Sequence, residues 1–334
     1  MISKGVLSQR DSSSVYTLYR LNPIVAVDFG FNTAPFNLKY KFSDPTVKTL
    51  KYRHNMKGMM GFHAAYKWFS IRVAAGLFKN MRPINLFGKS NYLDFGLQCS
   101  FKNFHGEVDY RQYYGYVLMN AKWKPDYSPT IPHDLDYNLD VHNVGLKLTY
   151  FQNSNFKMDA FYGSRGVYNK EVFTWYLLSK VDMFGVKNDS GPLFPDHLID
   201  STNTKTRAES LGAIEFGVMP GFGHANRVKS WQYGVLLAIG PRMQLKDYEV
   251  GGNKTTKASI VPRYDMKVMV AYTKPKYFAA LHFEVDNKNI NFNLLKYNQN
   301  FFSVRLQAGW RFEETSKEIR QKKRAEREQA KVQP

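Results

Sequence analysis

A two-residue alternation of apolar and polar side chains recurs along this chain and limits what it can fold into. In Phe301–Phe312, every second residue from Phe302 onward is apolar, and the residues between include Arg305 and Arg311. Side chains of a strand alternate between two faces, so this segment predicts a strand with one apolar face and one mostly polar, basic face. Such a strand fits either a soluble sandwich or a membrane barrel with lipid outside and water inside.

A second segment separates these two folds. In 104–117, one face carries His105, Glu107, Asp109 and Arg111, while the other is mostly aromatic. A soluble core strand seldom places so charged a face behind so aromatic a one, whereas a wall between water and lipid needs both. Alternation also predicts strands near 25–31, 36–42, 56–66, 69–78, 92–101, 139–151, 156–163, 171–186, 210–219, 230–247, 257–272 and 277–286.

The predicted connections differ in length from one to the next. Short turns are expected at 67–68, 102–103, 152–155 and 273–276, and long loops at 79–90, 119–137, 187–208, 248–256 and 287–299. Short turns at one end and long loops at the other are typical of bacterial outer-membrane barrels. The up-down order of the strands breaks between about 163 and 208, which leaves 12 to 14 strands. We therefore predict an all-β fold, a closed antiparallel transmembrane β-barrel over 21–312, between a polar segment 1–20 and a charged tail 313–334.

Composition agrees with a barrel, but the N-terminal sequence does not supply the signal that an outer-membrane protein requires. No run of 18 apolar residues is present, so no transmembrane helix is expected, and a mean hydropathy of −0.45 does not exclude strands that face water on one side. Residues 1–14 lack the apolar core of a secretory signal, which delivery to an outer membrane requires. Three alternatives remain open: the signal was removed, the start is misplaced, or the membrane interpretation is wrong.

The formal net charge of +19 favours anionic partners. Single-strand nucleic-acid binders need aromatic and basic groups on one surface, but here they lie on opposite faces, so no nucleic-acid partner is predicted. We expect contacts with outer-membrane lipid and lipopolysaccharide, and with other envelope proteins, through the long loops and the basic tail. The tail is rich in helix-forming residues, has little apolar stripe and is expected to be solvated in the periplasm.

Four motifs resemble an uncharacterised family of Bacteroidota outer-membrane β-barrel proteins, which is described only as a domain of unknown function. The motifs are Leu-Lys-Tyr-Arg-His-Asn at 50–55, Tyr-Lys-Trp-Phe at 66–69, Tyr-Leu-Asp at 92–94, and the ending at 304–312. The likeness runs from about 20 to 312. It departs from the family at His54, where a proline is expected, and in the basic tail. The resemblance implies an outer-membrane location and makes Trp310 and Phe312 a candidate assembly signal, with no catalytic residues to carry over.

The candidate functional residues are charged and histidine side chains that alternation places on the lumen face. Opposite charges on this face can pair across strands, so a structural ion-pair network is favoured over a permeation path or a catalytic site. Arg305 and Arg311 are predicted to pair with Glu284 and Asp286. The predicted network is His63, Arg72, Asp94, His105, Glu107, Asp109, Arg111, Asp265, Lys267, His282, Glu284, Arg305 and Arg311.

Motifs for other chemistry are weak. Ser70 and Ser100 face inward, but neither lies in a Gly-x-Ser-x-Gly turn. The histidines are scattered, and Cys99 alternates with apolar neighbours as a small hydrophobe. No catalytic, cofactor or metal site is predicted. We predict a structural or accessory component of an outer-membrane assembly, with a narrow pore as the first alternative and a lumenal hydrolase as the second.

Overall fold

The computed structural model describes residues 14–40, 49–55, 57–119, 134–201 and 203–313. These residues form sixteen strands, two short α-helices and two 3-10 turns. The elements are β1 (Tyr16–Leu18), β2 (Ile24–Thr33), β3 (Phe36–Tyr40), β4 (Thr49–His54), β5 (Met59–Tyr66), β6 (Phe69–Ala75), α1 (Ile84–Phe87), β7 (Asn91–Phe101), β8 (Phe104–Leu118), β9 (Asp134–Phe151), α2 (Met158–Phe161), β10 (Gly166–Tyr168), β11 (Val172–Asn188), η1 (Asp196–Leu198), η2 (Thr204–Arg207), β12 (Ser210–Val228), β13 (Trp231–Val250), β14 (Asn253–Thr273), β15 (Tyr277–Phe292) and β16 (Leu295–Arg311).

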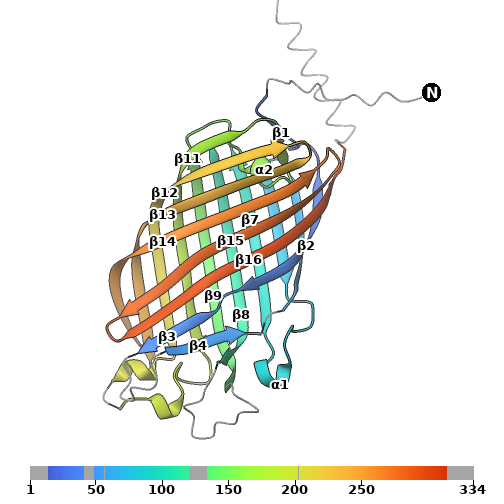
Figure 1. Cartoon of the computed structure of the whole chain (residues 1–334). Helices are drawn as coiled ribbons and strands as arrows, with labels where there is room; N and C mark the ends of the chain where they lie inside the picture. Colours follow the sequence, from blue (N-terminus) through green and yellow to red (C-terminus); the bar gives the residue numbers. More distant parts are fainter. Residues whose placement is uncertain (1–13, 41–48, 56, 120–133, 202, 314–334) are drawn as a thin grey trace, which may run out of the picture.

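Twelve of these strands pair in a ring (Figure 1). Antiparallel pairing runs from β2 through β5, β6, β7, β8, β9, β11, β12, β13, β14 and β15 to β16, and β16 pairs back with β2. Strand β3 continues β2 along β16, and β4 joins β3 to the end of β8. The ring lies within the predicted 12 to 14 strands, and the fold is the predicted antiparallel transmembrane β-barrel.

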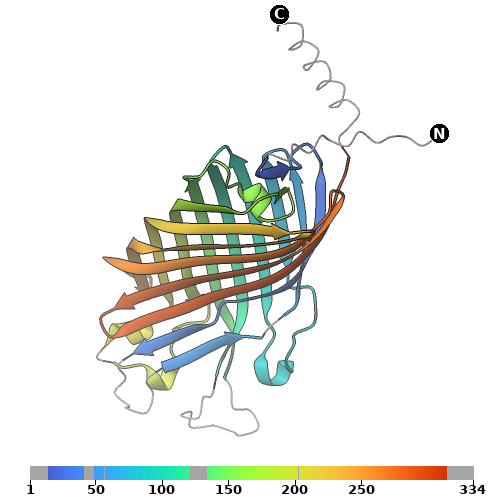
Figure 2. The same ribbon diagram turned by 45° about the horizontal axis from the view of Figure 1, so that its top comes forward.

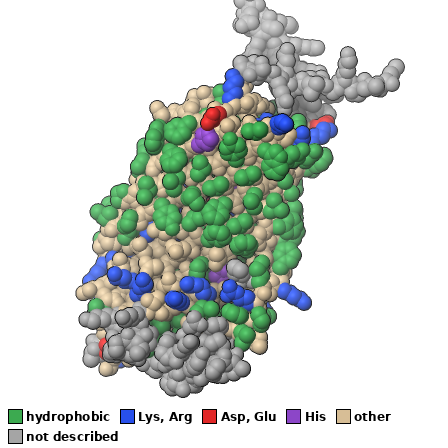
Figure 3. Space-filling model, viewed as in Figure 1, with side chains coloured by type: hydrophobic (Ala, Val, Ile, Leu, Met, Phe, Trp, Pro, Cys, Tyr) green, Lys and Arg blue, Asp and Glu red, His purple; other side chains and the backbone are tan. Residues whose placement is uncertain are grey.

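Each wall strand shows the period that a barrel between lipid and lumen requires. Along β11, buried residues such as Lys180 and Phe184 alternate with exposed ones such as Trp175 and Leu177. The exposed positions of the other strands are also largely apolar, for example Phe62, Ile239 and Leu306. Figure 3 shows hydrophobic side chains over most of the outer surface on one side of the barrel. The inward set is instead mixed in character, as expected for an interior that must be filled.

The two ends of the barrel differ. Two-residue turns begin at Lys67, Lys102 and Lys229, each in the left-handed conformation, at the end where the chain enters β2 and leaves β16 (Figures 1 and 2). We call this the terminal end. Helix α1 and both 3-10 turns lie at the opposite end, which we call the loop end. Among the described residues, no helix is long and apolar enough to cross a bilayer.

Several sequence-based assignments were wrong. Residues 156–163, predicted as a strand, contain helix α2 because a four-residue helix is too short to display a helical period. The predicted loops 248–256 and 287–299 are mostly strand, with tight turns at Gly251–Gly252 and at residues 293–294. Without a strand at 156–163, successive wall strands alternate in direction throughout, and the break in up-down order between 163 and 208 disappears. The predicted loop 119–137 lies largely outside the described residues.

Candidate functional site: a filled and charged lumen

The interior of the barrel is layered along its axis. On β15, the buried residues run from Phe278 and Ala280 through His282, Glu284, Asp286 and Lys288 to Ile290 and Phe292. The same order of apolar, charged and apolar side chains recurs on β11. Around the ring, these stretches form three stacked layers: an apolar layer at the terminal end, a charged layer in the middle and an apolar layer at the loop end.

The apolar layer at the terminal end is built around an inserted segment. Residues 152–171 connect β9 to β11, carry α2 and β10, and pair through β10 with β1. We call residues 152–171 together with β1 the plug. Phe156 and Phe161 of the plug are buried against inward residues of the wall such as Met219 and Met269. In Figures 1 and 2, α2 lies within the mouth of the barrel.

Arg311 secures this plug from the last wall strand. Its guanidinium donates to the carbonyls of Gly163 at 2.6 Å and Ser164 at 2.8 Å, and to the Thr273 hydroxyl at 3.0 Å. The predicted pairing of Arg311 with a lumen acid is therefore wrong. Arg311 ends its strand beside the plug, where backbone carbonyls rather than carboxylates are in reach.

Asp159 is a second anchor of the plug. Its carboxylate accepts from Arg20 at 2.9 Å and pairs with Arg165 at 3.1 Å, and Arg165 also donates to the Lys67 carbonyl at 2.5 Å. Burial lowers the pKa of the Arg165 guanidinium, and the Asp159 charge opposes that shift. These contacts connect the N-terminal segment, the plug and the turn between β5 and β6, so residues 16–20 are docked against the barrel.

The charged layer contains one continuous chain of ion pairs. It begins at Asp109 beside Arg111 (3.5 Å), and Arg111 reaches Glu284 across the lumen (3.4 Å). Every further residue of the chain has a charged atom within 4.0 Å of an oppositely charged atom of another residue of the chain. Seven acids and seven bases take part: Asp109, Glu284, Glu107, Asp265, Asp286, Asp182 and Glu215 with Arg111, Arg305, Lys267, Lys147, Lys180, Arg242 and Arg263. The two sets balance, so this chain of ion pairs is neutral when all fourteen are ionised.

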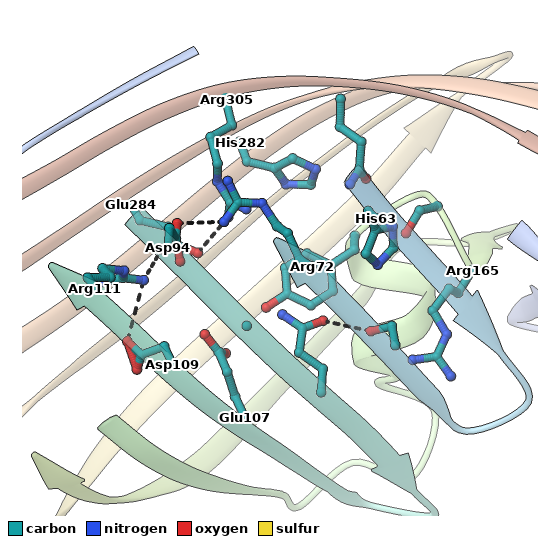
Figure 4. Close-up of a pocket in the computed structure, with 16 residues that line it drawn as sticks. His63, Arg72, Asp94, Glu107, Asp109, Arg111, Arg165, His282, Glu284 and Arg305 are labelled. Atoms are coloured by element: carbon teal, nitrogen blue, oxygen red, sulfur yellow. Dashed lines mark hydrogen bonds and ion pairs between the residues drawn. The ribbon is translucent and has the colours of Figure 1, made fainter. Parts of the chain in front are cut away.

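A smaller cluster lies beside this chain. Arg72 pairs with Asp28 and, at 2.6 Å, with Asp94, and Gln307 donates to the other oxygen of Asp28. Figure 4 shows Arg72 and Asp94 pointing toward the same interior space as Glu284 and Arg305. The space between them is a cavity of about 50 Å³, enough for a few water molecules.

The sequence predicted partners for two of the lumen residues, Arg305 and Arg311, and only the Arg305 pairing is present. All thirteen predicted residues point inward, and twelve are buried, with Arg305 partly so. Arg305 does pair with Glu284, at 3.1 Å, on the neighbouring strand. Asp286 pairs instead with Lys180 of β11, and Lys267 of β14 pairs with Glu107 of β8, both across the lumen. Alternation identifies the face of a strand but not the strand that lies opposite.

Sequence reasoning missed several members of the network. Lys147, Lys180, Asp182, Glu215, Arg242 and Arg263 are as buried as the predicted residues. Each occupies an inward position on a strand that the sequence did predict, so the same alternation rule could have found them. Their strands are also long, and the charged residues are interrupted by apolar ones on the same face, which weakens the signal.

Ser100 and His105 are the pair that most resembles catalytic machinery. The Ser100 hydroxyl lies 3.0 Å from His105 Nδ1 across the turn between β7 and β8. His105 Nε2 has no hydrogen-bonding partner among the described residues, so no carboxylate orients the ring as a catalytic base requires. Within the described residues, no group of three or more His, Cys, Asp or Glu is arranged to hold a metal ion.

The ring, the apolar exterior and the filled interior define a plugged transmembrane β-barrel. The chain belongs to the family described as "Domain of unknown function (DUF4421)", whose model matches residues 27–312. His54, where the resemblance predicted a proline, accepts from the Ala34 backbone N–H through Nε2 at 3.1 Å. No match was found among curated proteins.

Several solved structures are similar to this chain. The P. putida toluene transporter TodX is 8% identical, with a TM-score of 0.34 over 88% of this chain and 91% of that chain. The translocator domain of autotransporter NalP from Neisseria meningitidis is 11% identical, with a TM-score of 0.37 over 87% and 88%. The beta domain of the Bordetella autotransporter Brka is 10% identical, with a TM-score of 0.34 over 87% and 99%.

Proposed function

We propose that this protein is a plugged barrel of a Gram-negative outer membrane that serves as a structural or accessory component of an envelope assembly. The observation that carries this proposal is the filled lumen. Ion pairs such as Lys267–Glu107 (2.7 Å) and Lys180–Asp286 (2.7 Å) join strands that are not neighbours in the ring, and apolar layers cover them at both ends. A barrel bridged in this way offers its outer surface and its ends, rather than a channel, to partners.

A narrow pore is the second candidate, and the charged layer is the observation that favours it. Polar groups line the cavity beside Arg72 and Glu284, as they would line a water-filled path. An ion could pass only after the plug and the crossing ion pairs had moved. The pore hypothesis therefore requires a second conformation with the contacts of Arg311 and Asp159 broken.

A lumenal hydrolase is the third candidate and rests on Ser100 and His105 alone. A nucleophile needs a base in hydrogen-bond reach, and this pair supplies one. The pair is buried, however, and the base lacks an orienting acid, so this role is the least supported of the three.

Purification from native membranes under mild detergent tests the accessory role. The full chain should co-purify with one or more envelope proteins in fixed ratio, and chemical cross-links should map to the loop end or to outward wall residues. A chain that emerges alone from membranes under several mild detergents, with no cross-linked partner, would contradict the proposal.

A further inference from the structure

The outer face at the loop end is polar on four neighbouring strands. The register aligns one row of Asn289 (β15), Asn298 (β16), Asn37 (β3) and Lys51 (β4), with each side chain directly opposite the next. The adjacent row is Asn291, Lys296, Lys39 and Thr49 on the same four strands. We call these eight residues the amide–lysine face. Neighbours within a row are about 5 Å apart at Cβ, which makes this a compact surface.

Three lysines on the amide–lysine face have no matching acid among the residues that the structure describes. Lys39 and Lys296 are directly opposite each other, and Lys51 is diagonal to Lys39. All three are exposed, and the outward positions of β3, β4, β15 and β16 carry no Asp or Glu. Like charges in direct cross-strand contact are unfavourable unless an anion lies between them.

Three other exposed lysines of the described chain do have such a partner. Lys187 pairs with Asp189 at 2.8 Å, Lys254 with Asp247 at 3.1 Å and Lys276 with Glu313 at 2.9 Å. The amide–lysine face differs from these three pairs because its lysines lie together on one surface whose strands carry no outward acid.

The level of this face in the wall indicates which anion is near. Outward residues change from Val285 and Phe302, which are directly opposite each other, to Asn287 and Asn300 at the next outward pair. The change from apolar to polar side chains marks the edge of the hydrocarbon layer, where lipid headgroups begin. The same boundary is visible in Figure 3, where Lys and Arg side chains lie below the hydrophobic surface. The loop end of such barrels faces outward, so the headgroups are those of the outer leaflet.

We propose that the amide–lysine face binds the phosphorylated sugar headgroup of a surrounding lipid. Lys39, Lys51 and Lys296 neutralise the phosphate, and the three lysines are close enough to contact one headgroup. Asn298 and Asn37 lie between them; the Asn298 amide can both donate to and accept from sugar hydroxyls, and the Asn37 amide can donate while its oxygen accepts from Arg53 at 3.2 Å. Extended hydrocarbon chains of the same lipid then lie along the apolar wall beside Val285 and Phe302. This inference rests on the proposed location in an outer membrane, but it does not depend on the accessory role.

Native mass spectrometry of the detergent-solubilised full chain tests this site, with diphosphorylated lipid A and its dephosphorylated form as probes. The wild type should retain the phosphorylated form at about tenfold lower concentration than the dephosphorylated one, and the triple variant Lys39→Gln, Lys51→Gln, Lys296→Gln should lose that preference. A matched control removes three exposed turn lysines at the terminal end: Lys67→Gln, Lys102→Gln, Lys229→Gln. The control should bind within about twofold of the wild type.

A second variant guards against a folding defect. Lys296→Glu places an acid directly opposite Lys39, which replaces a repulsive cross-strand pair with an attractive one and should leave the barrel folded. It should abolish the preference for the phosphorylated lipid. The proposal is overturned if the wild type binds both lipids equally, if either face variant keeps the preference, or if the terminal-end control loses it. This experiment measures lipid binding and not association with envelope proteins. A negative result would therefore leave the proposed accessory role unaffected.

Discussion

Replacement of Lys180 by methionine tests whether the charged layer holds the barrel together. Lys180 is 1% exposed, and its ammonium lies 2.7 Å from Asp286, 3.1 Å from Asp182 and 3.6 Å from Asp265. Lys180→Met keeps most of the length of the side chain but removes its charge. Asp182 keeps Arg242 at 2.5 Å, and Asp265 keeps Lys147 at 3.9 Å. Asp286 is left with no ion pair among the described residues.

Removing one partner of a buried pair leaves an uncompensated charge, which costs about 3–5 kcal/mol. We therefore expect Lys180→Met to lower the free energy of unfolding by that amount. The double variant Lys180→Met, Asp286→Asn removes the stranded charge as well and should recover at least half of the loss. The measurement is reversible denaturant unfolding of the barrel in lipid vesicles, followed by tryptophan fluorescence.

An exposed ion pair provides the control. Lys187 and Asp189 are 57% and 62% exposed at their side chains, so Lys187→Met should leave the unfolding midpoint nearly unchanged. Equal stability of Lys180→Met and Lys187→Met would refute the role of the charged layer. A double variant as unstable as Lys180→Met would refute the assignment of Asp286 as the stranded partner.

Three further predictions concern the plug, the serine–histidine pair and the end of the last strand. Arg311→Met removes the donors to Gly163 and Ser164, so protease cleavage within 152–171 should become several-fold faster than in the wild type, whereas Arg305→Met should not accelerate it; equal cleavage in all three proteins would show that Arg311 does not hold the plug. Ser100→Ala should leave the rate of short-chain ester hydrolysis at the wild-type level, since the pair is interpreted as structural; hydrolysis by the wild type that Ser100→Ala abolishes would establish the hydrolase instead. Phe312→Ala should reduce the amount of folded barrel in cell membranes while refolding into detergent is unchanged, because Phe312 is 48% exposed and supports no core packing; normal membrane levels would remove Phe312 as an assembly signal.

Much of this fold is predictable because alternation is a local property. The inward and outward faces of Phe301–Phe312 and of 104–114 follow directly from the residues, and the structure places them as expected. Beyond Tyr114 a register shift turns Tyr116, predicted to face outward, into the interior. The plug is not predictable in this way. Phe156, Met158, Ala160 and Tyr162 are apolar or aromatic at every second position, which imitates a strand, although they form a helical turn inside the barrel.

The partners within the lumen are also beyond local reasoning. Arg305 and Glu284 lie on adjacent strands of one hairpin, so their pairing could be predicted from the turn between them. The pairing of Lys267 with Glu107 joins residues 160 positions apart and depends on the diameter of the ring. Only the closed arrangement of twelve strands determines which side chains meet across the interior.

Single-channel recording of the full chain in planar lipid bilayers tests the central claim of a filled lumen most directly. The lumen is filled by three layers, and ion pairs in the middle layer cross it from β8 to β14 and from β11 to β15. A lumen filled in this way should allow no steady ion flow. Insertion is verified independently by protease protection of the reconstituted barrel. The account predicts a silent bilayer at moderate voltage with verified insertion. Long-lived, uniform conductance steps from the wild-type protein would contradict it and establish an open pore.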